Sequence, residues 1–202
     1  MNINIETFDK WAKLNKDESM ERGHQNSVDK MFEIIEQSKI INNSFSFIDI
    51  GCGNGWVIRK ILKKPNCNDG LGIDGSKQMI KKANDKQKGR FIQTEIESFS
   101  FSKQFDIVFS METFYYFKDP ESVIQNIYKN GLKNNGMIVI GIDHFKENTE
   151  SLSWGEDYNL ELTTLSTNEW IELFTKSNFK QINHFVNEYK NNDKTLIISA
   201  KK

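Results

Sequence analysis

The chain of 202 residues contains only two prolines, two cysteines and three histidines, and it has no long apolar run. A transmembrane helix needs about 20 consecutive apolar residues, so we expect no membrane span. The first residues, MNINIETFDKWAK, lack the basic-then-apolar order of a signal peptide. No stretch rich in proline, glycine and serine separates two parts, so we expect one domain over 1–202. Together these absences predict a cytoplasmic protein.

Neither the charge nor the cysteine content points to a particular partner. The 27 Lys and Arg residues nearly balance the 28 Asp and Glu residues, which leaves a net charge of −1. Such a chain has no overall attraction to nucleic acid or to an anionic membrane. Cys52 and Cys67 form neither a disulfide framework nor a zinc set. No cluster of His, Cys and Asp has ligand spacing, so we expect no metal.

The most informative segment is FIDIGCGNG, residues 47–55, in which a buried strand ends in Asp49 and runs into glycines 51, 53 and 55. A helix follows at once, and this order is typical of a nucleotide site at a helix N-terminus. A dinucleotide loop places its third glycine five residues after the first, whereas here it follows after four. Asp49 would repel a pyrophosphate and attract a cationic ligand.

Strands and helices alternate along the first part of the chain. Short apolar runs predict parallel strands at 45–50, 69–74, 90–95, 105–110 and 136–142, with helices between most of them. This alternation predicts an α/β fold with a doubly wound sheet. Near the end, HFVNEY and TLIISA are separated only by KNNDK, which predicts an antiparallel hairpin. A plain dinucleotide fold would need a further crossover helix there instead.

The glycine loop with its preceding acid resembles that of class I S-adenosylmethionine-dependent methyltransferases, whose ligand carries an ammonium and a sulfonium. The family has a mostly parallel seven-stranded sheet with an antiparallel strand near its end, as the hairpin predicts here. The resemblance covers about residues 45–141 and, more weakly, the hairpin. It implies a Rossmann-like methyltransferase fold and S-adenosyl-L-methionine as the cofactor.

Several residues take family positions for that cofactor. Asp74 ends the second strand, where an acid can accept both ribose hydroxyls. TEIESFSF resembles the family's segment after the third strand, with a Glu for its usual Asp and a Ser for its proline. The resemblance implies that Glu95 and Ile96 contact the adenine. The predicted cofactor residues are Asp49, Gly51, Cys52, Gly53, Asp74, Gly75, Ser76, Glu95, Ile96, Ser110 and Met111.

The acceptor side is less clearly marked. His24, Glu112 and His144 are the candidate catalytic residues, because a base is needed when the acceptor is a hydroxyl, an ammonium or an acidic carbon. His24 can equally be a residue that starts a helix, and His144 one that hydrogen-bonds within a loop. We expect residues 1–40 to form a helical lid. Residues 143–166 would form an acceptor-side insert, whose acidic and aromatic side chains favour an amine-bearing or aromatic acceptor.

The sequence therefore predicts an enzyme that transfers a methyl group from S-adenosylmethionine to a small-molecule acceptor. Adenine or amide methylation is disfavoured, because SMETFYYF after the fourth strand lacks an Asx-Pro-Pro segment. The alternatives are a protein or RNA methyltransferase, a cofactor-binding partner subunit without catalysis, or a NAD-dependent oxidoreductase. We expect a monomer or a homodimer.

Overall fold

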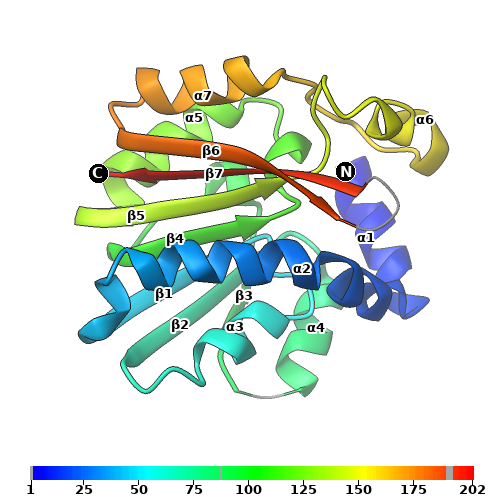
Figure 1. The fold of residues 1–202 in the computed structure, drawn as a ribbon. Coiled ribbons are helices and arrows are strands. Elements are labelled where there is room, and N and C mark those ends of the chain that lie inside the picture. The colour runs from blue at the N-terminus through cyan, green and yellow to red at the C-terminus, as the bar shows by residue number, and fades with distance from the viewer. Residues whose placement is uncertain (1, 87, 190–192) are drawn as a thin grey trace.

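A seven-stranded sheet forms the centre of the molecule, and helices cover both of its faces (Figure 1). The computed structural model describes residues 2–86, 88–189 and 193–202. The strands lie in the order β3-β2-β1-β4-β5-β7-β6. Their bounds are β1 Phe45–Ile50, β2 Cys67–Asp74, β3 Arg90–Gln93, β4 Phe105–Met111, β5 Leu132–Ile142, β6 Lys180–Tyr189 and β7 Asp193–Lys201.

The strand directions confirm the predicted fold class. Strands β1 to β5 pair in parallel, whereas β7 pairs antiparallel with both β5 and β6. The predicted hairpin is therefore present, although residues 190–192 of its connection lie outside the described residues. Strand β5 begins four residues earlier than predicted, because Leu132 already pairs with Phe105 across a register shift.

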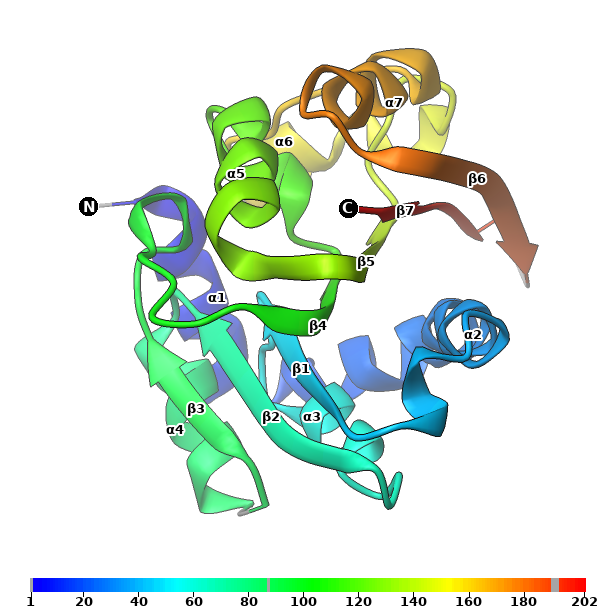
Figure 2. The same ribbon diagram turned by 90° about the vertical axis from the view of Figure 1, so that its left-hand side faces the viewer.

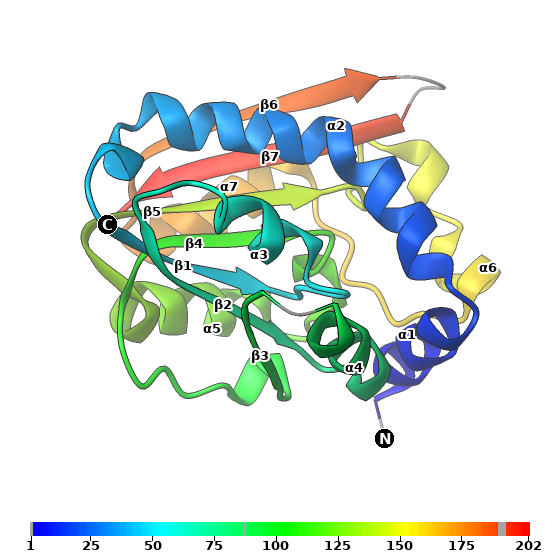
Figure 3. The same cartoon turned by 90° about the horizontal axis from the view of Figure 1, so that it is seen from below.

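Two layers of helices enclose the sheet. Figure 2 shows α5 and α7 on one side and α2 and α3 on the other, and Figure 3 shows the α2 side from below. All six residues of β1 are buried, as the apolar run FSFIDI predicts for a strand covered on both faces. The helices are α1 Ile3–Lys13, α2 Lys16–Gln37, α3 Trp56–Ile61, α4 Lys77–Asp85, α5 Pro120–Asn126, α6 Trp154–Tyr158 and α7 Thr167–Lys176.

Local sequence signals explain where several helices begin. The Ser76 side chain accepts a hydrogen bond from the Met79 N–H and caps α4. Ser166 and Glu169 form a capping box at the start of α7. The helical segment that begins after Asp119 consists of α5 and a π-helical turn, η4 Ile127–Gly131. Short 3-10 turns occur at η1 Ile40–Asn42, η2 Ile96–Ser98, η3 Phe114–Tyr116 and η5 Thr149–Ser151.

Helix α1 lies beyond the C-terminal ends of the parallel strands (Figures 1 and 3). Ligands of open α/β sheets bind at this edge, in the crevice where the strand order reverses. The reversal here lies between β1 and β4, because the chain continues from β1 to β2 and β3 on one side and returns to β4 on the other. The fold therefore places the glycine loop after β1 at the position expected for a ligand.

Candidate active site

The glycine loop after β1 needs glycine for both conformation and space. Gly51, Gly53 and Gly55 all have positive φ, between +51° and +78°. A Cβ atom on Gly51 would lie 1.9 Å from Oγ1 of Thr113, whereas one on Gly53 would meet no atom within 4 Å. The loop backbone at Gly51 is thus packed tightly against the segment that follows β4.

Asp74, at the end of β2, organises this loop. Its Oδ2 accepts a hydrogen bond from the Gly53 N–H at 2.9 Å, and its Oδ1 accepts one from the Ser76 N–H at 2.7 Å. Each carboxylate oxygen keeps lone pairs for further donors, such as a ribose diol. Burial is the largest cause that raises the pKa of Asp74, to about 6, and the two backbone donors partly oppose it.

We expect nucleoside binding to depend on pH through Asp74. The carboxylate is fully ionised well above its pKa of about 6, and below that value it gains a proton and loses acceptor capacity. The affinity for S-adenosylhomocysteine should therefore be steady near about pH 7.5 and fall by about tenfold for each pH unit well below about 6. Calorimetry across this range measures the slope.

The Asp74→Asn variant is the control for that slope. It cannot ionise at this position, so most of the pH dependence should disappear while the fold is kept. A wild-type affinity that is unchanged between about pH 7.5 and about pH 5 would contradict the assignment.

The burial of Asp74 also affects stability, because the folded protein binds a proton at this carboxyl group between the ordinary pKa of 3.8 and about 6. The free energy of unfolding should therefore fall as the pH rises through this window.

A single cavity joins the glycine loop, the strand ends and the N-terminal helices. Its lining comes from α1 and α2, from the loops after β1, β2, β3 and β4, and from the first turns of α3 and α4. The lining residues are Asn2, Asn4, Ile5, Phe8, Asp17, Met20, Glu21, His24, Asp49, Gly51, Cys52, Gly53, Asn54, Trp56, Val57, Asp74, Gly75, Ser76, Met79, Glu95, Ile96, Glu97, Met111, Glu112, Thr113, Tyr116 and Phe117.

All predicted cofactor residues except Ser110 line this cavity. Asp49 is 2% exposed, and burial raises its pKa well above the ordinary range, with a smaller contribution from the charge of Asp74. The Ser110 side chain is buried outside the cavity, where its Oγ donates to the Ile50 carbonyl at 2.6 Å. The structure therefore does not bring Ser110 to the predicted site, because its hydroxyl is used to join β4 to β1.

Two residues that sequence reasoning missed hold α2 against the loop. The Asn54 side chain donates from Nδ2 to Asp17 at 3.0 Å and to Glu21 at 3.2 Å. Asp17 also forms an ion pair with Lys82 of α4 at 2.5 Å. Asn54 lies within the glycine loop, and this position could have marked it as a site residue. Nothing in the neighbouring sequence marks Asp17 as its partner.

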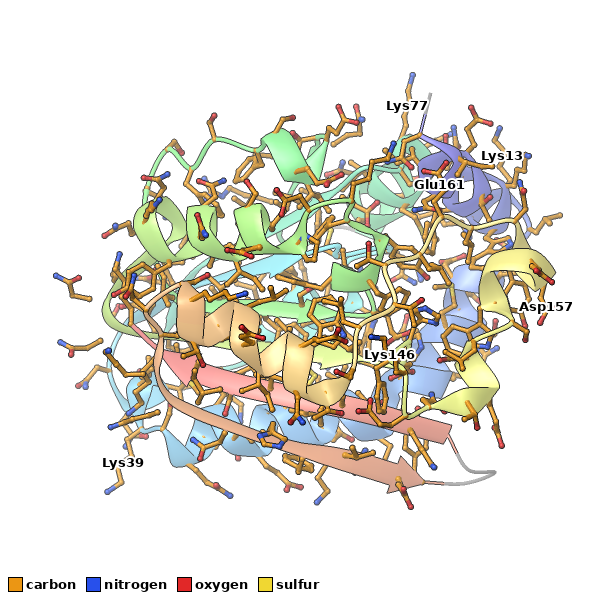
Figure 4. All side chains as sticks on the ribbon, turned by 90° about the horizontal axis from the view of Figure 1, so that it is seen from above. Lys13, Lys39, Lys77, Lys146, Asp157 and Glu161 are labelled. Atoms are coloured by element: carbon orange, nitrogen blue, oxygen red, sulfur yellow. The ribbon has the colours of Figure 1, made fainter. Side chains whose placement is uncertain are left out.

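Hydrogen bonds hold helix α1 in place at two points. Asn4 donates from Nδ2 to the Glu161 carbonyl and accepts from the Glu161 N–H, both at 2.8 Å. Figure 4 shows Glu161 beside α1. On the other side, Oδ1 of Asp9 accepts from Oγ of Ser76 at 2.5 Å and from the Gln78 N–H at 3.0 Å. Residues of α1 and α2 thus cover the cavity, at the place where the sequence predicts a lid.

His24 and Glu112 are brought together at one side of the cavity, next to Asp143. One ligand-type atom of each of these three residues lies within 4.8 Å of the others, and His24 Nε2 is 3.9 Å from Asp143 Oδ2. Burial lowers the pKa of His24 to about 4, so the imidazole is neutral near pH 7. No metal was predicted at these residues, because they are far apart in the chain. The absence of a metal site stays a prediction.

Glu112 has an unusual backbone and a fixed carboxyl group. Its φ is +57°, a conformation that is rare for residues other than glycine and is often found at functional sites. Oε1 accepts from the Asp143 N–H at 2.6 Å, and Oε2 accepts from the Tyr115 hydroxyl. Burial, followed by the charge of Asp143, raises the pKa of Glu112 well above its ordinary range.

His144 is not part of the cavity. It is 1% exposed, its Nδ1 lies 3.0 Å from the Ser151 carbonyl, and its Nε2 lies 2.7 Å from Oγ1 of Thr164. The ring therefore holds the 143–166 segment together, which was the alternative interpretation of this residue. No described residue of the 143–166 segment lines the cavity, so the acidic side chains of the lining come from other parts of the chain.

The fold and the loop define a nucleoside-binding α/β domain of the class I methyltransferase type. Comparisons with known proteins agree. Residues 48–140 match the model of the family described as "Methyltransferase domain". A chain in the complex of the Haloferax volcanii Trm112 methyltransferase activator with a methyltransferase has a TM-score of 0.83 at 21% identity, over 96% of each chain. The S-adenosylmethionine-dependent methyltransferase of Mesorhizobium loti has a TM-score of 0.67 at 16% identity, over 79% of this chain and 92% of that one.

Two curated relatives are similar in sequence. Malonyl-[acyl-carrier protein] O-methyltransferase 2 of Ilyobacter polytropus is 33% identical over 72% of this chain, and the enzyme of that name from Calditerrivibrio nitroreducens is 29% identical over 78%. The chain spans 56% and 60% of their lengths. It therefore carries a methyltransferase domain, and the predicted resemblance to class I S-adenosylmethionine-dependent methyltransferases is confirmed. None of the described helices is long and apolar enough to cross a bilayer.

Proposed function

We propose that this protein transfers a methyl group from S-adenosylmethionine to a small-molecule acceptor. The observation that carries the proposal is the continuity of one cavity, which runs from Asp74 and the glycine loop to His24 and Glu112. A ligand held by the loop would thus have its reactive end beside a neutral imidazole and a carboxyl group.

The residues present fit that cofactor. Gly53 leaves open space beside its backbone, where a Cβ would meet no atom within 4 Å, and Asp74 can accept from a ribose diol. Glu95 and Ile96 line the cavity at the end of β3, where the family resemblance places the adenine. Asp49 offers a carboxyl group to an ammonium. When bound, S-adenosylmethionine supplies an electrophilic methyl group on a positively charged sulfur.

The chain's own contribution is positioning and the exclusion of water. Phe8 and Met20 come from the N-terminal helices, and Tyr116 and Phe117 from the loop after β4, so apolar surface closes the cavity from two sides. Alignment of two reactants in such an enclosure supplies much of a rate enhancement. His24 is neutral near pH 7 and can accept a proton from the acceptor, and the nearby Asp143 carboxyl would stabilise the resulting imidazolium.

The curated relatives favour a second candidate acceptor. Their names state that they methylate a malonyl group on an acyl-carrier protein, which is a carboxylate acceptor. A protein or RNA acceptor has less support, since the net charge is −1. A partner subunit without catalysis would keep the glycine loop and Asp74 but would show no turnover. Asp49 counts against a NAD-dependent oxidoreductase, because a carboxyl group at this position would oppose a pyrophosphate when it is ionised.

Binding and transfer should be measured on the same protein. S-Adenosylhomocysteine and NAD are titrated by calorimetry, and methyl-labelled S-adenosylmethionine is then incubated with pools of small molecules, proteins and RNA, and with a malonyl thioester. We expect micromolar binding of S-adenosylhomocysteine, about −8 kcal/mol, and label in the small-molecule pool. Binding of NAD alone would refute the proposal. Binding without transfer to any pool would favour the partner subunit, and label in protein or RNA would identify that acceptor class.

A further inference from the structure

We infer that the acceptor is an amine, bound as its ammonium ion against Glu112 and the aromatic wall of the cavity. This inference rests on the proposed function and names the substrate class of the same site. It is carried by the charges and the rings that line the cavity, and it departs from the carboxylate acceptor named for the curated relatives.

The cavity is acidic throughout. Among the described residues that line it there are seven carboxyl groups, one histidine, and neither lysine nor arginine. The carboxyl groups are those of Asp17, Glu21, Asp49, Asp74, Glu95, Glu97 and Glu112. Arg59 interacts with Glu21, but it does not line the cavity and it donates to the Asn54 carbonyl at 2.7 Å. An anionic acceptor would therefore find no lysine or arginine in this lining with which to pair.

Several of these acids already have strong partners elsewhere. Asp17 is paired with Lys82, and Asp74 accepts from two backbone N–H groups. Oε1 of Glu97 accepts from the backbone N–H groups of Lys118 at 2.9 Å and Asp119 at 3.3 Å. These contacts fix the acids on the cofactor side and compensate part of their charge.

Glu112 differs from them because its hydrogen-bond partners among the described residues carry no positive charge, and its carboxyl group also forms a hydrogen bond with the Asp143 side chain. Its carboxyl oxygens accept from the Asp143 backbone and the Tyr115 hydroxyl, and the Tyr116 hydroxyl donates in turn to Tyr115 at 3.3 Å. Glu112 forms no ion pair with lysine or arginine of the described residues. A positively charged group of the ligand would supply an ion-pair partner for Glu112.

Aromatic rings stand beside that carboxyl group. Phe8 and Tyr116 line the cavity and meet edge to face, with ring centroids 5.1 Å apart, and Tyr115 packs against Tyr116 at 4.4 Å. The face of an aromatic ring attracts a cation, and the attraction grows when water is excluded. A carboxyl group next to such rings suits an ammonium ion better than an alcohol or a carboxylate.

The reaction balances with these groups. The ammonium nitrogen first gives a proton to Nε2 of His24, which leaves a neutral amine and an imidazolium next to Asp143. The nitrogen lone pair then forms a bond to the methyl carbon, and the electron pair of the carbon–sulfur bond goes to sulfur. The products are a methylated ammonium ion and neutral S-adenosylhomocysteine. The imidazolium afterwards returns its proton to water.

Three matched probes test the inference on protein saturated with S-adenosylhomocysteine. They are phenethylamine, 2-phenylethanol and 3-phenylpropionate, which share a ring and a short chain and differ in charge. We expect calorimetry to show the amine binding at least about tenfold more tightly than either of the others. The Glu112→Gln variant should reduce this preference to less than about threefold while its affinity for S-adenosylhomocysteine is kept. Glu156→Gln, an exposed site on α6 with the same loss of charge, should change nothing.

Each other outcome has a definite meaning. Equal or tighter binding of 3-phenylpropionate, or no binding of any probe, would overturn the inference and leave the proposed function standing. A preference for the amine that needs added Mg²⁺ or Mn²⁺ and disappears with a chelator would also overturn it, because it would assign His24, Glu112 and Asp143 to a metal. Failure of S-adenosylhomocysteine to bind would instead refute the proposed function.

Discussion

Replacing Asp74 by alanine is expected to weaken the binding of S-adenosylhomocysteine by at least about tenfold, or about 1.4 kcal/mol. Two losses add up in this variant. The ribose loses a charged acceptor, and the Gly53 N–H loses the Oδ2 partner that now lies 2.9 Å away. The glycine loop should therefore bind the nucleoside less well even where Asp74 does not touch it. Calorimetric titration measures the change.

Asp69→Ala is the matched control for this substitution. Asp69 belongs to the same strand, β2, but it pairs with Arg90 and Lys103 outside the cavity. Its loss should leave the affinity for S-adenosylhomocysteine within about twofold, since exposed ion pairs contribute little. If the two variants bind the nucleoside equally well, the role assigned to Asp74 is wrong.

The Gly51→Ala variant should lose nucleoside binding altogether and also lose stability. The added Cβ would lie 1.9 Å from Oγ1 and 2.7 Å from Cβ of Thr113, so the whole Thr113 side chain and its backbone must move. The positive φ of +77° adds strain of about 1 kcal/mol or more. We expect the free energy of unfolding to fall by about 2–4 kcal/mol, measured by denaturant titration.

The Gly53→Ala variant tests the effect of backbone strain without a steric clash. Gly53 also has a positive φ, +51°, but a Cβ there would meet nothing within 4 Å. This variant should lose only about 1 kcal/mol of stability and should keep measurable binding. Equal effects of the two substitutions would show that backbone conformation, and not the approach of Thr113, sets the requirement for glycine at position 51.

The sequence predicts those parts of the fold and the site whose residues are close together in the chain. The glycine loop, its acid at Asp49 and the strand-end Asp74 lie in short segments, so their positions follow from the order of strand, loop and helix. The parallel sheet and the antiparallel hairpin were also predicted, because they follow from the alternation of strands and helices and from the short connection near the end of the chain. Cys52 lines the cavity as a buried residue of the loop.

Long-range contacts were beyond local reasoning. His24 belongs to α2, whereas Glu112 and Asp143 directly follow β4 and β5, so the three residues meet only through the packing of elements that are far apart in the chain. His144 directly follows Asp143, yet its ring is held by Ser151 and Thr164 away from the cavity. Neighbouring residues at the end of a strand point in different directions, so sequence position alone could not choose between these two.

The hydrogen bonds that hold α1 in place have a consequence for the order in which the products leave. Ile5 of this helix packs where a Cβ on Gly75 would lie, at 2.8 Å, and so covers the ribose side of the cavity. We expect a nucleoside there to exchange when the Asn4 and Asp9 contacts open. The spent nucleoside should thus leave last, and the opening of α1 would set an upper limit on kcat. In product-inhibition kinetics, S-adenosylhomocysteine would then compete with S-adenosylmethionine but not with the acceptor.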